Sequence, residues 1–154
     1  MSAMNNRILK FVSLAGCVMF AGCNSKGIPV EYASLCNPAN DKKIVEVVGY
    51  FKNSGNAMCS NSKNDSAMRC PINFVDTPTS TVVPIHAQIA MGKGNNQIEN
   101  VDKKGLKIRD DKGEFVDNTQ KVKITASIGV FIPPPTQKNA ALCYMRQVKK
   151  IEKL

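Results

Sequence analysis

Cysteine is the residue type that offers this chain the most chemistry. A cysteine thiolate can bind zinc, act as a nucleophile, carry a lipid or pair with a second cysteine in a disulfide. No Cys-x-x-Cys pair occurs in the chain, so the usual spacing of a zinc site is missing. The chain has six cysteines, which are Cys17, Cys23, Cys36, Cys59, Cys70 and Cys143.

The other residues with chemical potential do not form a recognisable catalytic or metal-binding pattern. His86 is the only histidine, and no nucleophile stands at a spacing typical of a dyad or triad with it. Residues 110–114 (DDKGE) hold three carboxylates but lack the alternation of a calcium loop, and Asp with Gly favours a tight hairpin turn. Residues 92–94 (GKG) lack the spacing of a phosphate-binding loop. We therefore expect no enzyme activity, no metal and no cofactor.

The first 23 residues have the composition of an export signal. Ten residues with two basic side chains and no acid precede an apolar run at 11–22, and small residues stand just before Cys23. A basic head, an apolar stretch of about 7–15 residues and a small-residue cut site are typical of such a signal. Cys17 is a second candidate for the residue after the cut, but cutting there leaves only residues 11–16 as the apolar run.

This arrangement resembles the bacterial lipoprotein signal, whose lipobox usually has the form Leu-(Ala/Ser)-(Gly/Ala)-Cys. The matching residues here are Phe20-Ala21-Gly22-Cys23, with Phe20 in place of Leu. The resemblance implies that residues 1–22 are removed as a signal peptide and that Cys23 receives acyl chains. The partner would then be membrane lipid, reached through those chains.

Two other interpretations of the leader stay open. A transmembrane helix needs about 20 apolar residues, and this run is shorter and ends at residues 24–26 (NSK). An ordinary secretory signal fits the small residues before the cut but leaves Cys23 without a role. The lipoprotein resemblance implies a location in the bacterial cell envelope. In such lipoproteins an Asp directly after the lipidated cysteine marks retention in the inner membrane. Asn24 stands there instead, so the resemblance favours the outer membrane facing the periplasm over the periplasmic face of the inner membrane or the cell surface.

Four cysteines follow Cys23, and export to an oxidising compartment favours disulfides between them. Four cysteines allow three pairings. We predict Cys59–Cys70, which ties the ends of a polar loop, and Cys36–Cys143, which ties the N-terminal segment to the last strand.

The mature chain is basic. The leader contains Arg7, Lys10 and no acid, so 21 − 2 = 19 basic and 12 acidic residues remain, a net charge of +7. A basic surface fits anionic neighbours such as phospholipid headgroups or acidic glycans, but a solvated polar surface that keeps the protein soluble is the favoured explanation. A possible basic binding face on two late strands comprises Lys121, Lys123, Arg146, Lys149 and Lys150.

Short runs rich in β-branched and aromatic residues, separated by Gly, Pro and Asn, predict an all-β domain at 43–154 behind a tether at 23–42. In the first strand, Val45, Val47 and Phe51 share one apolar face, and Gly49 predicts a bend or bulge. The last segment also fits a helix, because apolar residues recur every third position. The predicted strands span 43–52, 68–75, 82–91, 105–110, 115–116, 121–132 and 142–151, with loops at 53–66 and 92–100.

The order of these strands resembles an OB-fold, a small barrel of five to six strands found in exported bacterial lipoproteins. Only residues 114–120 precede the long strand at 121–132, too few for the helix that an OB-fold often carries there, so an immunoglobulin-like β-sandwich stays as the alternative. We expect a non-enzymatic, membrane-anchored binding or structural module whose partner is an unknown envelope protein or glycan. The alternative is an OB-type domain that binds an anionic polymer, for which we expect acidic glycan rather than nucleic acid outside the cytoplasm.

Overall fold

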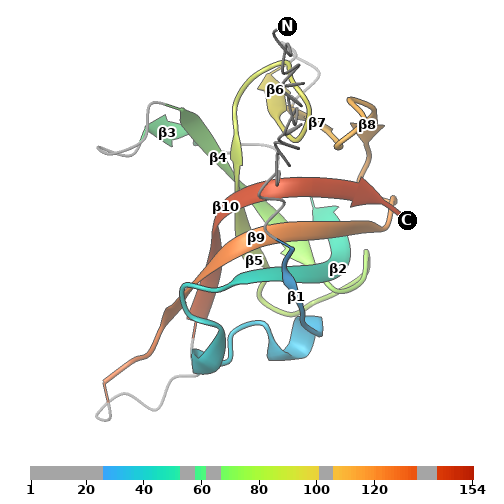
Figure 1. Ribbon diagram of the computed structural model, residues 1–154. Helices are drawn as coiled ribbons and strands as arrows, with labels where there is room; N and C mark the ends of the chain where they lie inside the picture. Colours follow the sequence, from blue (N-terminus) through green and yellow to red (C-terminus); the bar gives the residue numbers. More distant parts are fainter. Residues whose placement is uncertain (1–25, 53–57, 62–66, 101–105, 135–141) are drawn as a thin grey trace, which may run out of the picture.

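The computed structural model describes residues 26–52, 58–61, 67–100, 106–134 and 142–154 (Figure 1). Cys17, Cys23 and the predicted signal peptide lie outside the described residues, as does Pro135 of the proline run.

Five strands close into a barrel. In chain order these are β2 (Ile44–Lys52), β4 (Met68–Val75), β5 (Ile85–Ala90), β9 (Val122–Phe131) and β10 (Leu142–Lys153). The sheet runs β2-β9-β10-β5-β4 and returns to β2 through a β2–β4 pairing. All neighbours are antiparallel except β5 and β10, which are parallel.

This pairing order is that of an OB-like barrel, and it confirms the predicted fold class. An immunoglobulin-like sandwich would instead place its strands in two separate facing sheets. The five strands lie within three residues of their predicted limits, because each carries a long enough run of β-branched and aromatic residues to be recognised.

Alternation of inward and outward side chains produces the barrel core, as expected from the sequence. On β2, Val45, Val47 and Phe51 are buried, while Val48 is 37% exposed on the outer side. The inner row of β9 is completely buried and consists of Val122, Ile124, Ala126 and Ile128.

Gly49 marks the point at which β2 changes partners. Residues before it pair with β9, and Tyr50, Phe51 and Lys52 pair with β4. A Cβ at Gly49 would lie 2.4 Å from the carbonyl oxygen of Val75 and 2.6 Å from the Phe74 ring. Only glycine allows these two strands to approach so closely where the sheet curls.

The last strand is extended but irregular. Its register against β9 shifts between Met145 and Gln147 and again between Val148 and Lys150. Each bulge inserts one extra residue, so Met145, Val148 and Ile151 all face the core although they are three positions apart. The three-residue spacing that also fitted a helix is therefore the mark of a strand with two bulges.

The segment expected to be a tether is folded onto the barrel from residue 27 onward. β1 (Ile28–Pro29) pairs in parallel with β2, and two 3-10 helices follow, η1 (Tyr32–Ser34) and η2 (Pro38–Asn40). Leu35 is fully buried, and the hydroxyl of Tyr32 donates to the carbonyl of Phe74 over 2.9 Å. The domain thus begins well before residue 43, because short segments with one or two buried side chains carry no periodic pattern.

A second, three-stranded sheet occupies the connection between β5 and β9. It comprises β6 (Ile98–Asn100), β7 (Leu106–Arg109) and β8 (Phe115–Val116). β6 lies in the stretch expected to be a loop at 92–100. This sheet occupies the place of the helix that many OB-folds have before their fourth strand. The segment 114–120, which is too short for that helix, is therefore compatible with a barrel. β3 (Ser60–Asn61) likewise pairs with β4 inside the loop expected at 53–66.

Both predicted disulfides are present. Cys36 is bonded to Cys143, 107 positions away, and Cys59 to Cys70, 11 positions away. The first joins the folded N-terminal segment to β10, and the second joins the residues before β3 to β4. Together they use all four cysteines that follow Cys23.

Candidate functional surfaces

The five residues of the predicted basic face occupy two separate places. Lys123 on β9 and Lys150 on β10 contact the same carboxylate, Glu152, at 2.8 Å each, and Lys150 also lies 3.3 Å from Asp111. Arg146 lies toward the opposite end of β10. Glu152 and Asp111 lie between the basic residues, so this surface is a network of alternating charge rather than a continuous basic stripe.

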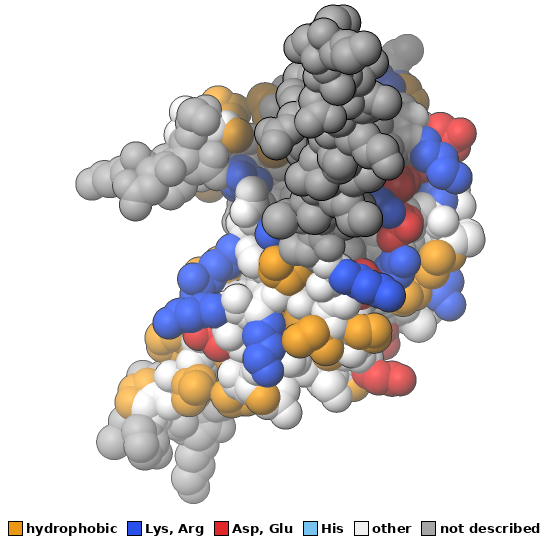
Figure 2. Space-filling view, viewed as in Figure 1, with side chains coloured by type: hydrophobic (Ala, Val, Ile, Leu, Met, Phe, Trp, Pro, Cys, Tyr) orange, Lys and Arg blue, Asp and Glu red, His pale blue; other side chains and the backbone are white. Residues whose placement is uncertain are grey.

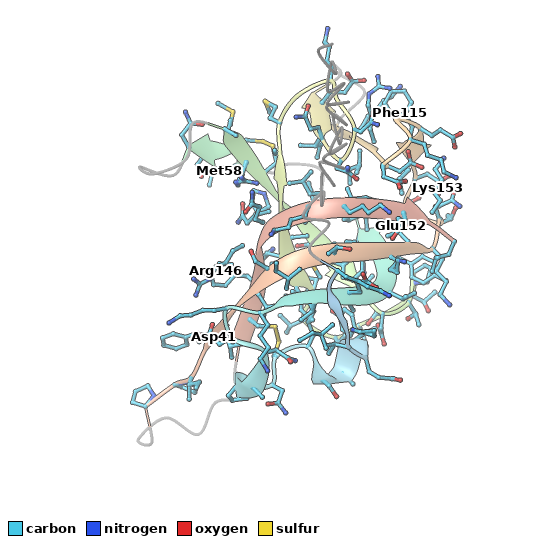
Figure 3. All side chains as sticks on the ribbon, viewed as in Figure 1. Asp41, Met58, Phe115, Arg146, Glu152 and Lys153 are labelled. Atoms are coloured by element: carbon cyan, nitrogen blue, oxygen red, sulfur yellow. A yellow bond between two sulfur atoms is a disulfide. The ribbon has the colours of Figure 1, made fainter. Side chains whose placement is uncertain are left out.

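The ion pairs around Glu152 shift the acidities of their members. Hydrogen bonds from Lys123 and then Lys150 hold the pKa of the Glu152 carboxyl below its ordinary value. The same hydrogen bonds raise the pKa of both ammonium groups. Figure 3 places Glu152 and the neighbouring Lys153 on the side of the barrel near the small sheet, where Lys153 contacts Glu114 at 2.8 Å.

Arg146 is held by an aromatic ring and a carboxylate. Its guanidinium lies 5.7 Å from the centre of the Tyr144 ring and 3.6 Å from an oxygen of Asp41. Both side chains cover Gly129, where an added Cβ would lie 2.3 Å from the Arg146 Nε and 2.9 Å from the Tyr144 ring. The glycine of β9 therefore creates the space in which Arg146 and Tyr144 pack.

His86 lies in an outward-facing row that continues from Tyr144. It is the register partner of Tyr144 on one side and of Asn73 on the other, and it is exposed. The row crosses β10, β5 and β4, and we call it the cleft face. The surface is hollowed on this side, between the β3–β4 end and the β9–β10 hairpin, with Lys and Arg side chains along the hollow (Figure 2). OB-folds use the corresponding strands and loops to bind oligomers.

Exposed apolar side chains flank the cleft face. Phe131 and Leu142 are register partners near the tip of the β9–β10 hairpin and are 57% and 60% exposed. Met58 and Met68 stand on the opposite flank at the β3–β4 end. Sequence reasoning did not single out these residues, although apolar side chains beside Pro133 at a strand end are a signal that could have done so.

A groove of about 500 Å³ lies beside β1. Lys121 and Lys123 line it, but so do Glu31, Glu46 and Asp76. An anionic ligand would meet three carboxylates there. Two of the five predicted basic residues thus face a surface of mixed charge.

A pocket of about 430 Å³ opens between the barrel and the small sheet. Phe51 and Ile72 form its barrel side, and Ile108 and Val116 its small-sheet side. Phe115 stands at its rim, with the Lys107 ammonium 4.7 Å and the Arg109 guanidinium carbon 4.2 Å from the ring centre.

The carboxylates at 110–114 have structural partners. Asp110 is 1% exposed and accepts hydrogen bonds from the backbone N–H groups of Lys112, at 3.0 Å, and Glu114, at 2.8 Å. Gly113 has a φ of +84°, which completes the turn between β7 and β8. The tight turn predicted here is present. Within the described ranges, no group of three His, Cys, Asp or Glu side chains is placed to hold a metal ion.

The glycines at 92–94 also belong to a turn. The Gln97 side chain accepts a hydrogen bond from the Gly94 N–H over 2.8 Å and leaves no room for a side chain at Gly92. No helix among the residues that the structure describes is long and apolar enough to span a bilayer.

Comparison with protein-family models, with curated proteins and with solved structures finds no match to this chain. The surfaces described above are therefore interpreted from their own geometry.

Proposed function

We propose that this protein is a non-enzymatic lipoprotein of the bacterial envelope, anchored by acyl chains on Cys23 and presenting an OB-like barrel as a binding or structural module. The anchor faces the periplasm, and the partner is an envelope protein or glycan. The observation that carries the proposal is the division of the cysteines. The four that follow Cys23 pair in two disulfides, while Cys23 stands behind a basic head and an apolar run.

Two features support this assignment. Disulfides persist in oxidising compartments, which agrees with export. A single acyl chain binds a bilayer only marginally, whereas two or more chains give stable attachment. Several acyl chains on the single residue Cys23 are therefore sufficient as an anchor. Outer-membrane attachment is proposed from Asn24 after the lipidated cysteine.

The test is membrane fractionation of the full chain and of its C23S variant. The wild-type protein should sediment with membranes and carry acyl chains by mass spectrometry, whereas C23S should be released. The matched control is C17S, which should sediment like the wild type. Full sedimentation of C23S, or an unmodified N-terminal methionine on the wild-type protein, would contradict the proposal.

A second function, binding of an anionic polymer such as an acidic glycan, is favoured by the cleft face. Arg146 stacked beside Tyr144, with His86 as a cross-strand neighbour, combines a cation with a stacking surface. Binding there should weaken with salt in proportion to the number of charges contacted. R146A should reduce both affinity and the salt slope, and K93A, at an exposed turn away from this face, should change neither.

A further inference from the structure

We infer that the outer surface of β2, β9 and the second half of β10 lies against the bilayer that holds the acyl chains of Cys23, and contacts its phospholipid headgroups. The inference rests on the proposed function. We call this surface the anchor face. Its outward side chains are Ile44, Glu46, Val48, Lys123, Ser127, Gln147, Lys149, Lys150 and Glu152.

The first step is the length of chain between the lipid and the barrel. Four peptide units separate Cys23 from Gly27, and an extended chain covers at most about 3.3–3.6 Å per residue, so the two Cα atoms lie within about 14 Å. A strand of ten residues such as β9 is itself roughly 33 Å long. The link is thus shorter than the barrel, and one side of the barrel must stay close to the membrane.

The second step is the place where the chain leaves the barrel. Gly27 is buried, and its N–H donates to the carboxylate of Glu46 over 3.3 Å. The Glu46 side chain points outward from β2, because Val45 and Val47 on either side of it face the core. The chain therefore leaves over the outer surface of β2, and β1 is seen in front of β2 (Figure 1).

The third step is the set of residues around that exit. Ile28 is the register partner of Val45, so Gly27 stands beside Ile44. Across the sheet, Ile44 pairs with Ser127, and Ser127 pairs with Gln147. At strand spacings of about 4.8 Å this whole row lies within roughly 15 Å of Gly27. The cleft face begins at Tyr144 on the first half of β10 and continues across β5 and β4, so it adjoins the anchor face and stays open to a partner.

The charge of the surface is mixed, which fits headgroups that carry both an ammonium and a phosphate group. Glu46 and Glu152 lie on it together with Lys123, and Lys149 is exposed and takes part in no ion pair with another described residue. Side-chain types mix on this side of the molecule, with Lys and Arg next to apolar groups (Figure 2). A lysine near an anionic membrane surface contributes about 1 kcal/mol, which is a roughly fivefold change in contact equilibrium.

The chain contains no tryptophan, so one introduced tryptophan reports on its own surroundings. Two reporters, V48W and Q147W, test the anchor face at exposed positions on different strands. The control is M68W, whose site is 40% exposed and lies at the end of β4 that pairs with β3. Each variant is purified as the full acylated chain and reconstituted in vesicles of phosphatidylcholine and phosphatidylglycerol that carry a nitroxide quencher on the headgroup.

We expect strong quenching of V48W and Q147W and little quenching of M68W. In the V48W background, K149Q should lower the contact equilibrium about fivefold, and K93Q should leave it unchanged. Equal quenching at all three reporters, or stronger quenching of M68W, in acylated protein would overturn the inference and leave the anchor intact. A chain without acyl groups by mass spectrometry would overturn the proposed function and this inference together.

Discussion

Cys36 and Cys143 join the first folded segment of the chain to the last strand of the barrel across 107 positions. Cys59 and Cys70 close a loop of only 11. Cross-linking lowers the entropy of the unfolded chain more for a longer loop. The two bonds are therefore unequal in what they contribute.

Removing the long-range disulfide should destabilise the protein more than removing the short one. The chain-entropy relation gives about 4–5 kcal/mol for the C36A/C143A variant and about 3 kcal/mol for C59A/C70A. Urea unfolding followed by circular dichroism measures both. A larger loss for C59A/C70A would show that the short loop matters for native packing rather than for the unfolded state.

Gly49 should tolerate no side chain. In G49A the new methyl group meets the Val75 carbonyl and the Phe74 ring, neither of which can move without opening the β2–β4 pairing. We expect a loss of about 1–3 kcal/mol in the free energy of unfolding. The control is G94A, where the nearest atom belongs to the flexible Gln97 side chain, at 3.1 Å, and where we expect a change within about 0.5 kcal/mol. Equal losses of stability in G49A and G94A would contradict the conclusion that the close approach of β2 and β4 requires a glycine at position 49.

Asp110 should stabilise its turn as a hydrogen-bond acceptor. D110A leaves two backbone N–H groups of the 110–114 turn without their acceptor, which should cost about 1–3 kcal/mol. D110N keeps an acceptor oxygen and should cost less. Thermal unfolding measures both, and adding calcium or a chelator should shift neither midpoint. A calcium-dependent midpoint in the wild type that disappears in D110N would instead indicate a metal site.

The carboxyl of Glu152 should titrate at lower pH than an ordinary glutamate. A lowered pKa in the folded state means that this group adds stability above its unfolded pKa and that the contribution is lost as the pH falls through the folded value. The raised pKa values of Lys123 and Lys150 act oppositely, so their contribution is complete at neutral pH and is lost as the pH rises through those values. NMR titration should show the Glu152 midpoint moving upward in K123M but not in K93M. An unchanged Glu152 midpoint in K123M would show that the hydrogen bond from Lys123 does not lower the pKa of this carboxyl.

The barrel strands could be predicted because alternation is strong where one face is fully buried. On β2 and β9 every second side chain enters the core, so the inner faces were evident from residue type alone. The disulfides could be predicted for another reason: Cys59 and Cys70 flank a polar loop, and pairing them leaves Cys36 to join the N-terminal segment to Cys143 in the last strand.

The remaining structure depended on pairings between distant segments. β1 and β3 are two residues long, and β6 is three, which is too short for any periodic signal. A regular strand would point Lys149 and Lys150 to opposite faces, but the bulge between Val148 and Lys150 leaves both outside the core, because Val148 and Ile151 are the buried residues. The position of Asp111 and Glu152 between those lysines likewise required the tertiary fold.

The long-range bond also makes the molecule a covalent ring from Cys36 to Cys143. A protease that cuts any one peptide bond inside this ring opens it without separating the pieces. Nicked molecules would therefore stay whole until a reductant reached the sulfurs. A single cut in a surface loop between these two cysteines would therefore leave both pieces of the barrel in one molecule.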